Sequence, residues 1–81
     1  MSFDQKTKDE LRMALLTLAN ERAPDKTFCP SEAARRVAEN WRPLMPEVRR
    51  IAVELGLAAT QKGVIVDPDK ARGPIRLRQR P

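Results

Sequence analysis

The chain has 81 residues, and its 16 Lys and Arg outnumber its 11 Asp and Glu, which gives a formal net charge of +5 at neutral pH. This length suffices for one domain around one hydrophobic core. The sequence has no His, no Tyr and a single Cys, so it lacks the commonest general base, the commonest zinc ligand and an intramolecular disulfide. We therefore expect a single domain over residues 1–81 that is not an enzyme and holds no metal or cofactor.

The chain is apolar enough to fold but has no long apolar segment. Hydrophobic residues make up 41% and charged residues 33% of the sequence, values typical of a folded domain. The longest uninterrupted apolar run covers only residues 13–16, too short for a membrane span or a secretory signal. These features predict a cytoplasmic protein with no membrane partner, and the single thiol fits a reducing compartment.

The first predicted helix covers residues 4–22 and ends before Pro24. Its inward stripe recurs at helical spacing and consists of Leu11, Leu15 and Leu18. Met13 and Leu16 fall on the other side of this helix. They are interpreted either as scattered surface residues or as the seam of a homodimer.

A short second helix is predicted over residues 30–38, because Pro30 suits the first helical position. The residues before it, 26–29, favour an extended conformation. Its inward positions carry small side chains, which let a neighbouring helix approach closely; they are Ala33, Ala34 and Val37. Trp41 follows in a turn, where it is expected to anchor the packing of the second and third helices.

The third predicted helix covers residues 43–55 and ends at Gly56. Beyond it the hydrophobic period changes to two, with tight turns at residues 62–63 and 67–69. Short antiparallel strands are therefore predicted over residues 57–61, 64–66 and 75–78. This order of elements indicates an α+β, mainly α, winged helix-turn-helix domain with three helices and a small antiparallel sheet.

The net charge is confined to the second half of the chain. Residues 1–41 contain seven basic and seven acidic residues, whereas residues 42–81 contain nine and four. Arg49 and Arg50 fall on the face of the third helix opposite its buried stripe of Leu44, Val48, Ile51 and Leu55. The second helix of a helix-turn-helix motif enters the major groove, and the planar donor fork of Arg suits phosphate and the guanine edge.

The predicted hairpin and last strand add further basic side chains. Lys62 lies at a tight turn beside Gly63, where a wing would follow the sugar-phosphate backbone. Arg76, Arg78 and Arg80, the last of them in a basic tail at 79–81, form a row of like charge. A bound polyanion would relieve the repulsion between these charges. Alternatively, the charges only protect an edge strand from aggregation. The predicted nucleic-acid-binding residues are Arg42, Arg49, Arg50, Lys62, Arg72, Arg76 and Arg78.

Cys29 precedes Pro30 at a predicted helix N-terminus, a position that lowers a thiol pKa in some proteins. A small buried side chain is the preferred interpretation, and a thiol sensor is the alternative. Ser31 has no His that would activate it as a nucleophile, so we interpret it as a residue of the helix start.

Several runs together resemble a known family: residues 28–35 (FCPSEAAR), 41–49 (WRPLMPEVR), 60–63 (TQKG), 66–68 (VDP) and 71–78 (ARGPIRLR). The chain from about residue 11 to residue 78 is similar to short bacterial proteins known as domain of unknown function 3253. The resemblance implies a bacterial winged-helix domain. It implies no activity and carries over no functional residue.

The sequence leaves open two functions of different classes. The first is a DNA-binding module with the third helix in the major groove and the wing on phosphates, held largely by counterion release. The second is a winged helix that binds an acidic protein or dimerises through Met13 and Leu16. The basic surface favours nucleic acid, double-stranded DNA in particular, as the partner.

Overall fold

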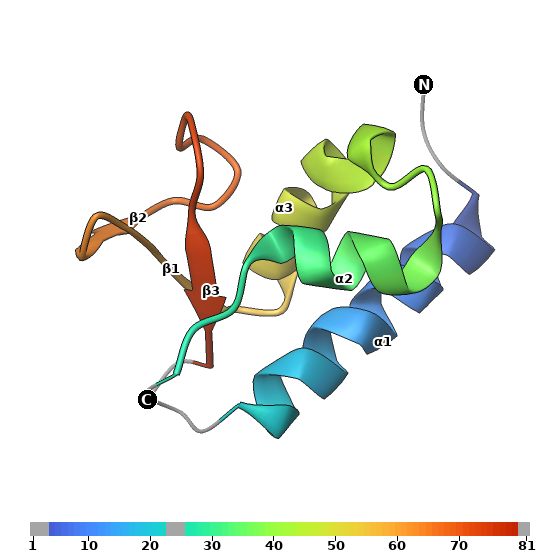
Figure 1. The fold of residues 1–81 in the computed structure, drawn as a ribbon, viewed down its shortest axis with the longest axis horizontal. Helices are drawn as coiled ribbons and strands as arrows, with labels where there is room; N and C mark the ends of the chain where they lie inside the picture. The colour runs from blue at the N-terminus through green and yellow to red at the C-terminus, as the bar shows by residue number, and fades with distance from the viewer. Residues whose placement is uncertain (1–3, 23–25, 80–81) are drawn as a thin grey trace.

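Three helices pack beside a three-stranded antiparallel sheet (Figure 1). The computed structural model describes residues 4–22 and 26–79. Its elements are α1 (Gln5–Glu21), α2 (Pro30–Val37), a 3₁₀ turn η1 (Arg42–Leu44), α3 (Met45–Glu54), β1 (Ala58–Gln61), β2 (Val64–Val66) and β3 (Arg76–Arg78). The α+β, mainly helical class predicted from the sequence is confirmed, and the arrangement is consistent with a winged helix-turn-helix.

The start of α2 is fixed by local chemistry and tied to the end of α1. Pro30 occupies the first turn, where its missing N–H costs nothing. The Glu32 carboxylate accepts the Cys29 N–H at 3.0 Å, which satisfies one of the free donors of the helix end. Arg22 donates to the same carboxylate at 2.6 Å, so α1 and α2 are joined where the chain passes from one to the other.

The predicted third helix is two elements in the structure. Residues 42–44 form a 3₁₀ turn, and the α-helix begins at Met45. Pro43 and Pro46 lie in the first turns of η1 and α3, where a proline is tolerated. Gly56, at φ 71°, ends α3 as expected because glycine adopts left-handed backbone without steric cost.

The sheet has the order β2-β1-β3, with β2 at one edge. The β1–β2 hairpin turns at Lys62 and Gly63, whose φ angles are 52° and 82°. Two positive φ values are the mark of the two-residue type I′ turn that matches strand twist. The extended segment before α2 also joins the sheet, because Phe28 exchanges backbone hydrogen bonds of 2.8 and 2.7 Å with Leu77.

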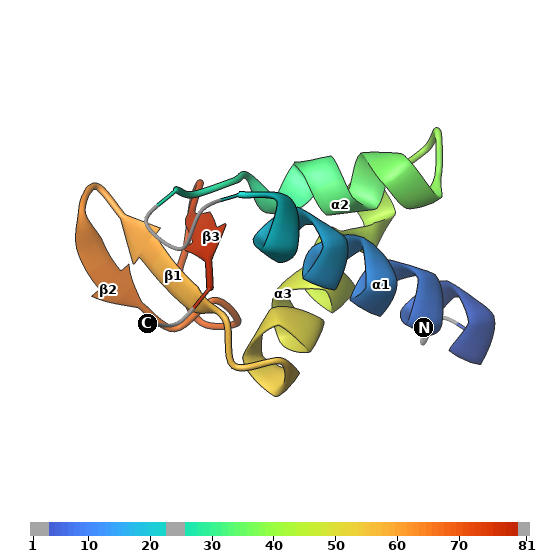
Figure 2. The same cartoon turned by 90° about the horizontal axis from the view of Figure 1, so that it is seen from below.

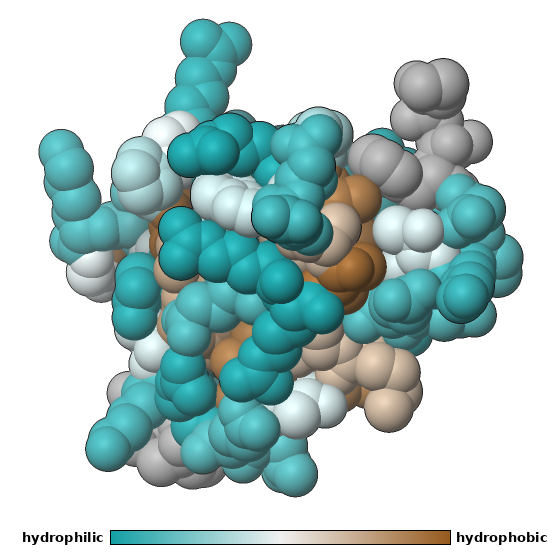
Figure 3. Space-filling view, turned by 45° about the vertical axis from the view of Figure 1, so that its right-hand side comes forward, coloured by the Kyte–Doolittle hydropathy of each residue, from teal (hydrophilic) through white to brown (hydrophobic). Residues whose placement is uncertain are grey.

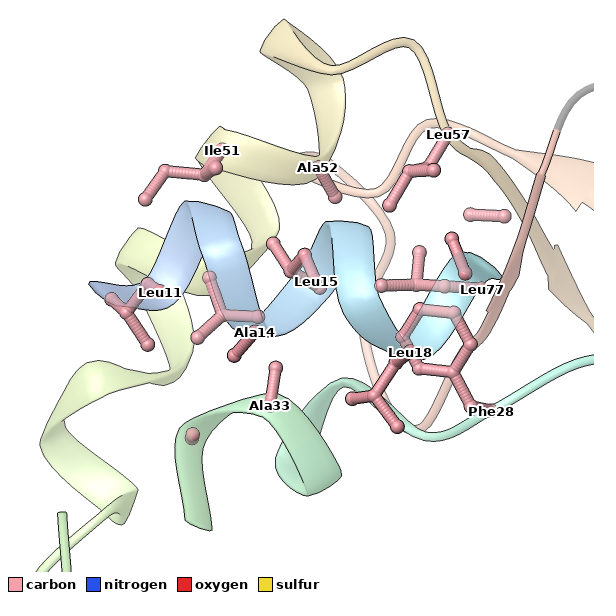
Figure 4. Close-up of a cluster of buried hydrophobic side chains, with 14 of the residues drawn as sticks. Leu11, Ala14, Leu15, Leu18, Phe28, Ala33, Ile51, Ala52, Leu57 and Leu77 are labelled. Atoms are coloured by element: carbon pink, nitrogen blue, oxygen red, sulfur yellow. The ribbon is translucent and has the colours of Figure 1, made fainter. Parts of the chain in front are cut away.

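The hydrophobic core joins the three helices to the sheet, which lie side by side in Figure 2. Leu15 lies near its centre, and Phe28 lies beside Leu77 where the helices meet the strands (Figure 4). Ile75 and Leu77 are buried, as predicted. The buried cluster consists of Leu11, Ala14, Leu15, Leu18, Ala19, Phe28, Ala33, Ala34, Leu44, Val48, Ile51, Ala52, Leu57, Ala59, Ile75 and Leu77.

Two kinds of feature are absent from residues 4–22 and 26–79. Within these ranges no helix combines the length and the apolar character that crossing a bilayer requires. The same residues bring together no group of three or more Cys, Asp or Glu side chains suited to a metal ion.

Candidate nucleic-acid interface

The outer face of α3 carries Pro46, Arg50 and Val53, all exposed. Their spacing of four and three residues places them on one side of the helix. Arg42, in the 3₁₀ turn just before α3, is exposed as well. Hydrophilic side chains cover most of the molecular face seen in Figure 3, with hydrophobic residues showing in patches between them. The outer face of α3 therefore offers one arginine and one aliphatic side chain to a ligand.

Arg50 is paired with a buried acid on its own helix. Its Nη1 lies 3.3 Å from Glu47 Oε1, and the Arg50 side chain is 56% exposed while that of Glu47 is 6% exposed. Within residues 4–22 and 26–79, Glu47 is the only charged residue that is buried. It lies in the first turn of α3, where the helix dipole favours a negative charge. The Arg50 side chain is thus largely exposed, although the Glu47 carboxylate partly compensates its charge.

Arg49, predicted to project from the same face, has a different environment. It is half-buried, and its Nη1 and Nη2 donate to the carbonyl oxygens of Ala71 and Gly73 at 2.6 and 2.7 Å. Both arms of the guanidinium therefore bind backbone of the segment that links β2 to β3. Helical spacing predicted Arg49 on the exposed face opposite the buried stripe, but the structure shows it half-buried against the β2–β3 loop. The spacing gave no sign of that loop.

Trp41 organises a second pair of basic side chains. The guanidinium carbons of Arg35 and Arg42 lie 4.8 and 4.7 Å from the centre of its ring, distances at which a cation is attracted to the π face. Trp41 is half-buried and packs against the hydrophobic core. The Arg42 side chain is thus held beside the N-terminus of α3.

The basic residues of the sheet have unequal freedom. Lys62 and Arg72 are exposed, at the hairpin tip and in the β2–β3 loop, and Arg78 is half-buried. Arg76 is exposed, but its Nε and Nη2 donate to Thr27 Oγ1 and Thr27 O at 3.1 and 3.2 Å. Arg76 therefore ties β3 to the segment before α2. Arg80 lies outside the described residues.

The structure also shows the surroundings of Cys29, Met13 and Leu16, the other residues considered from the sequence. Cys29 is half-buried rather than fully buried, and its Sγ accepts a hydrogen bond from Ser31 Oγ at 3.0 Å. Met13 and Leu16 are 62% and 44% exposed, on the side of α1 where helical spacing predicted them.

Two residues of this surface, Gln61 and Glu47, were missed by sequence reasoning. The amide nitrogen of Gln61 donates to the carbonyl oxygens of Arg72 and Pro74, next to the two that Arg49 contacts. The one sequence signal for this arrangement was the Gly-Pro pair at residues 73–74, which is typical of a turn with a defined backbone conformation. Glu47 lies in the first turn of α3 beside the buried Val48, and this position was the one sequence feature compatible with a buried acid.

The fold and this surface define a small α+β domain consistent with a winged helix, with basic side chains around the outer face of α3 and along the sheet. The chain belongs to the family described as Protein of unknown function (DUF3253), whose model matches residues 8–80. The resemblance stated from the sequence motifs is thereby confirmed. No curated protein matches the chain.

Proposed function

We propose that the protein is a cytoplasmic, non-enzymatic DNA-binding module that inserts α3 in the major groove and sets its hairpin on the sugar-phosphate backbone. One observation carries the proposal: the acids of α3 are neutralised while its outer arginine stays exposed. Glu47 is buried beneath Arg50, and Glu54 is paired with Arg12 of α1 at 3.3 Å. The Arg50 guanidinium is therefore the charged group that lies outermost on this face.

The conformation of Lys62 supports the same proposal. Among residues 4–22 and 26–79 it is the only non-glycine residue at positive φ, where Asn or Gly is favoured and a longer side chain is uncommon. A residue held in a less favourable conformation at an exposed tip suggests that its side chain has a use. An ammonium group beside Gly63 fits a phosphate contact.

The test is a fluorescence-anisotropy titration of a labelled mixed-sequence DNA duplex at several salt concentrations. Phosphate contacts release counterions, so the logarithm of the affinity should fall linearly with the logarithm of salt concentration. Arg50→Ala should weaken binding by about tenfold or more. Arg36→Ala is the matched control, because Arg36 is also an exposed helical arginine in an ion pair, with Glu21 at 3.0 Å.

Two results would contradict the proposal. One is the absence of detectable binding at low salt. The other is an equal loss of affinity for Arg50→Ala and Arg36→Ala, which would show that only total charge matters and that α3 has no privileged contact.

A second function is favoured by the exposed apolar residues of α1. Met13 and Leu16 are 62% and 44% exposed, and exposed apolar residues that gather on one face mark contact surfaces for proteins. A homodimer or a protein partner would cover them. Static light scattering of the chain and of Met13→Lys tests this: a dimer that Met13→Lys dissociates supports it, and a monomer at all concentrations contradicts self-association.

A further inference from the structure

We infer that Arg49 is a positioning residue, which together with Gln61 holds residues 70–74, called here the 70–74 loop, as a second phosphate-contacting element beside α3. This inference deepens the proposed function and rests on it. It assigns the DNA contact to Lys70 and Arg72 of the loop and withdraws it from Arg49, whose donors face the protein backbone.

Four consecutive carbonyl groups of this loop are bound by only two side chains. Arg49 of α3 donates to the oxygens of Ala71 and Gly73, at 2.6 and 2.7 Å. Gln61 of β1 donates to those of Arg72 and Pro74. The donors alternate along the loop, so it is gripped from the helix and from the sheet at once. In Figure 1 this loop stands at the upper end of the sheet, between β2 and β3.

The remaining parts of the loop agree with a fixed backbone. Gly73 adopts φ 86°, and a Cβ there would lie 3.3 Å from the amide nitrogen of Gln61, so both conformation and space favour glycine. At the other end, the Asp67 carboxylate accepts the N–H groups of Asp69 and Lys70 at 2.8 and 3.3 Å. Hydrogen bonds therefore hold the backbone on both sides of the basic residues.

A backbone fixed in this way has a consequence for binding. Lys70 and Arg72 are exposed, and the carbonyls around them are occupied by donors from within the protein. Ordering a loop during association costs free energy, and a loop that is already ordered avoids that cost. The hydrogen bonds from Arg49 and Gln61, called here the clamp, therefore hold the backbone of Lys70 and Arg72 beside α3 before a phosphate binds.

The geometry demands arginine at position 49 rather than any cation. A guanidinium presents two parallel donors in a rigid fork, whereas the ammonium of lysine is a point charge on a flexible stem. Arg49→Lys keeps the charge and loses the bidentate grip. Arg72→Lys, in contrast, keeps what a phosphate contact needs, because lysine binds phosphate well as a point charge.

The experiment compares DNA affinity and its salt dependence for Arg49→Lys, Arg49→Ala, Arg72→Lys and Arg72→Ala, with the labelled duplex above. Arg49→Lys should lose about as much affinity as Arg49→Ala, roughly three- to tenfold, whereas Arg72→Lys should stay close to the wild type. Gln61→Ala, which changes no charge, should weaken binding in the same direction. Circular dichroism verifies that each variant is folded at the assay temperature.

A combined variant separates positioning from contact. In the Lys70→Ala, Arg72→Ala background, adding Arg49→Ala should change neither the affinity nor the salt slope, because the side chains it positions are gone. If Arg49 contacted phosphate itself, the slope would fall by about 0.9 more. That result, or full retention of affinity by Arg49→Lys, would overturn the inference and leave the proposed function intact.

Failure of the proposed function gives a different result. If the wild type does not bind DNA at low salt, both the proposed function and the phosphate role of the loop are contradicted. Amide ¹⁵N heteronuclear NOE values for residues 70–73 then report on the clamp alone: a fall in Arg49→Lys and Gln61→Ala shows that it orders the loop, and unchanged values show that it does not.

Discussion

Glu47 and Arg50 show how one buried charge constrains its neighbour. Glu47 is 5% exposed, and an acid so deeply buried is destabilising unless hydrogen bonds or a positive charge compensate its lost hydration. The Arg50 guanidinium, 3.3 Å away, and the first-turn position both supply compensation. Arg50 consequently affects stability as well as the charge of the outer face.

Removing Arg50 should therefore destabilise the protein even without DNA. We expect Arg50→Ala to lower the free energy of unfolding by about 1–2 kcal/mol, since the buried Glu47 side chain loses its ion-pair partner. In the double variant Glu47→Ala, Arg50→Ala, the two losses should not add, because the same ion pair is removed only once. Urea denaturation of the four proteins measures the coupling, and strict additivity would contradict it.

Asp4 predicts a specific pH dependence at the start of α1. Hydrogen bonds donated by the Thr7 hydroxyl and by the Thr7 backbone N–H, with a smaller contribution from the charge of Lys6, hold the pKa of Asp4 below its usual range. A carboxyl whose pKa is lowered by folding stabilises the protein above its unfolded pKa, and this contribution is lost as the pH falls through the folded pKa.

The variant Asp4→Asn tests this contribution, because asparagine also caps helices but carries no charge. We expect the wild type to be more stable than Asp4→Asn at neutral pH, and the difference to shrink as the pH falls through the lowered folded pKa of Asp4. Melting temperatures over a pH series from neutral to acid measure it. A difference that is independent of pH would show that the charge of Asp4 does not contribute.

At the scale of single residues, sequence periodicity predicted which side chains are buried. It did not predict which hydrogen bonds they make. Leu44, Val48 and Ile51 are buried as the helical spacing required, while Leu55 is half-buried. Periodicity indicates which way a side chain leaves its own helix. It contains no information on a distant loop, so the capture of Arg49 by carbonyl groups 22 and 24 residues away had no sequence signal.

At the scale of elements, tight turns have the clearest sequence signals. The turn at Lys62 and Gly63 was predicted from a change of period and one glycine, and its φ angles of 52° and 82° confirm it. Irregular segments have weaker signals: the 3₁₀ turn at residues 42–44 was merged with the helix that follows, because Pro43 and Pro46 are compatible with either description.

The hairpin tip should show opposite effects on stability and binding. Asn-Gly is the preferred type I′ turn, so Lys62→Asn should raise the free energy of unfolding by about 0.5–1 kcal/mol. The same change removes a cation and should weaken DNA binding and reduce the magnitude of its salt slope by about 0.9. Urea denaturation and the anisotropy titration measure the two effects, and unchanged affinity would exclude Lys62 from the interface.

At the scale of the whole molecule, Phe28 connects the helical layer to the sheet. Its side chain is fully buried, close to Leu77 (Figure 4), and its backbone pairs with that residue through two hydrogen bonds. The residue pattern predicted an extended segment here but not its strand partner, because pairing across 49 residues of sequence leaves no local pattern. The sheet and the helices consequently share one core.

A shared core predicts that the domain unfolds as one unit. Trp41 fluorescence reports on the α2–η1 region and far-ultraviolet circular dichroism on all elements, so both should give the same urea midpoint. Phe28→Ala should cost about 3–5 kcal/mol, comparable to the whole stability of a domain this small, and leave it largely unfolded. Phe28→Leu preserves most of the buried volume and should shift both midpoints together to lower urea. Separate midpoints for the two probes would show that the sheet and the helices unfold independently, and that Phe28 does not couple them.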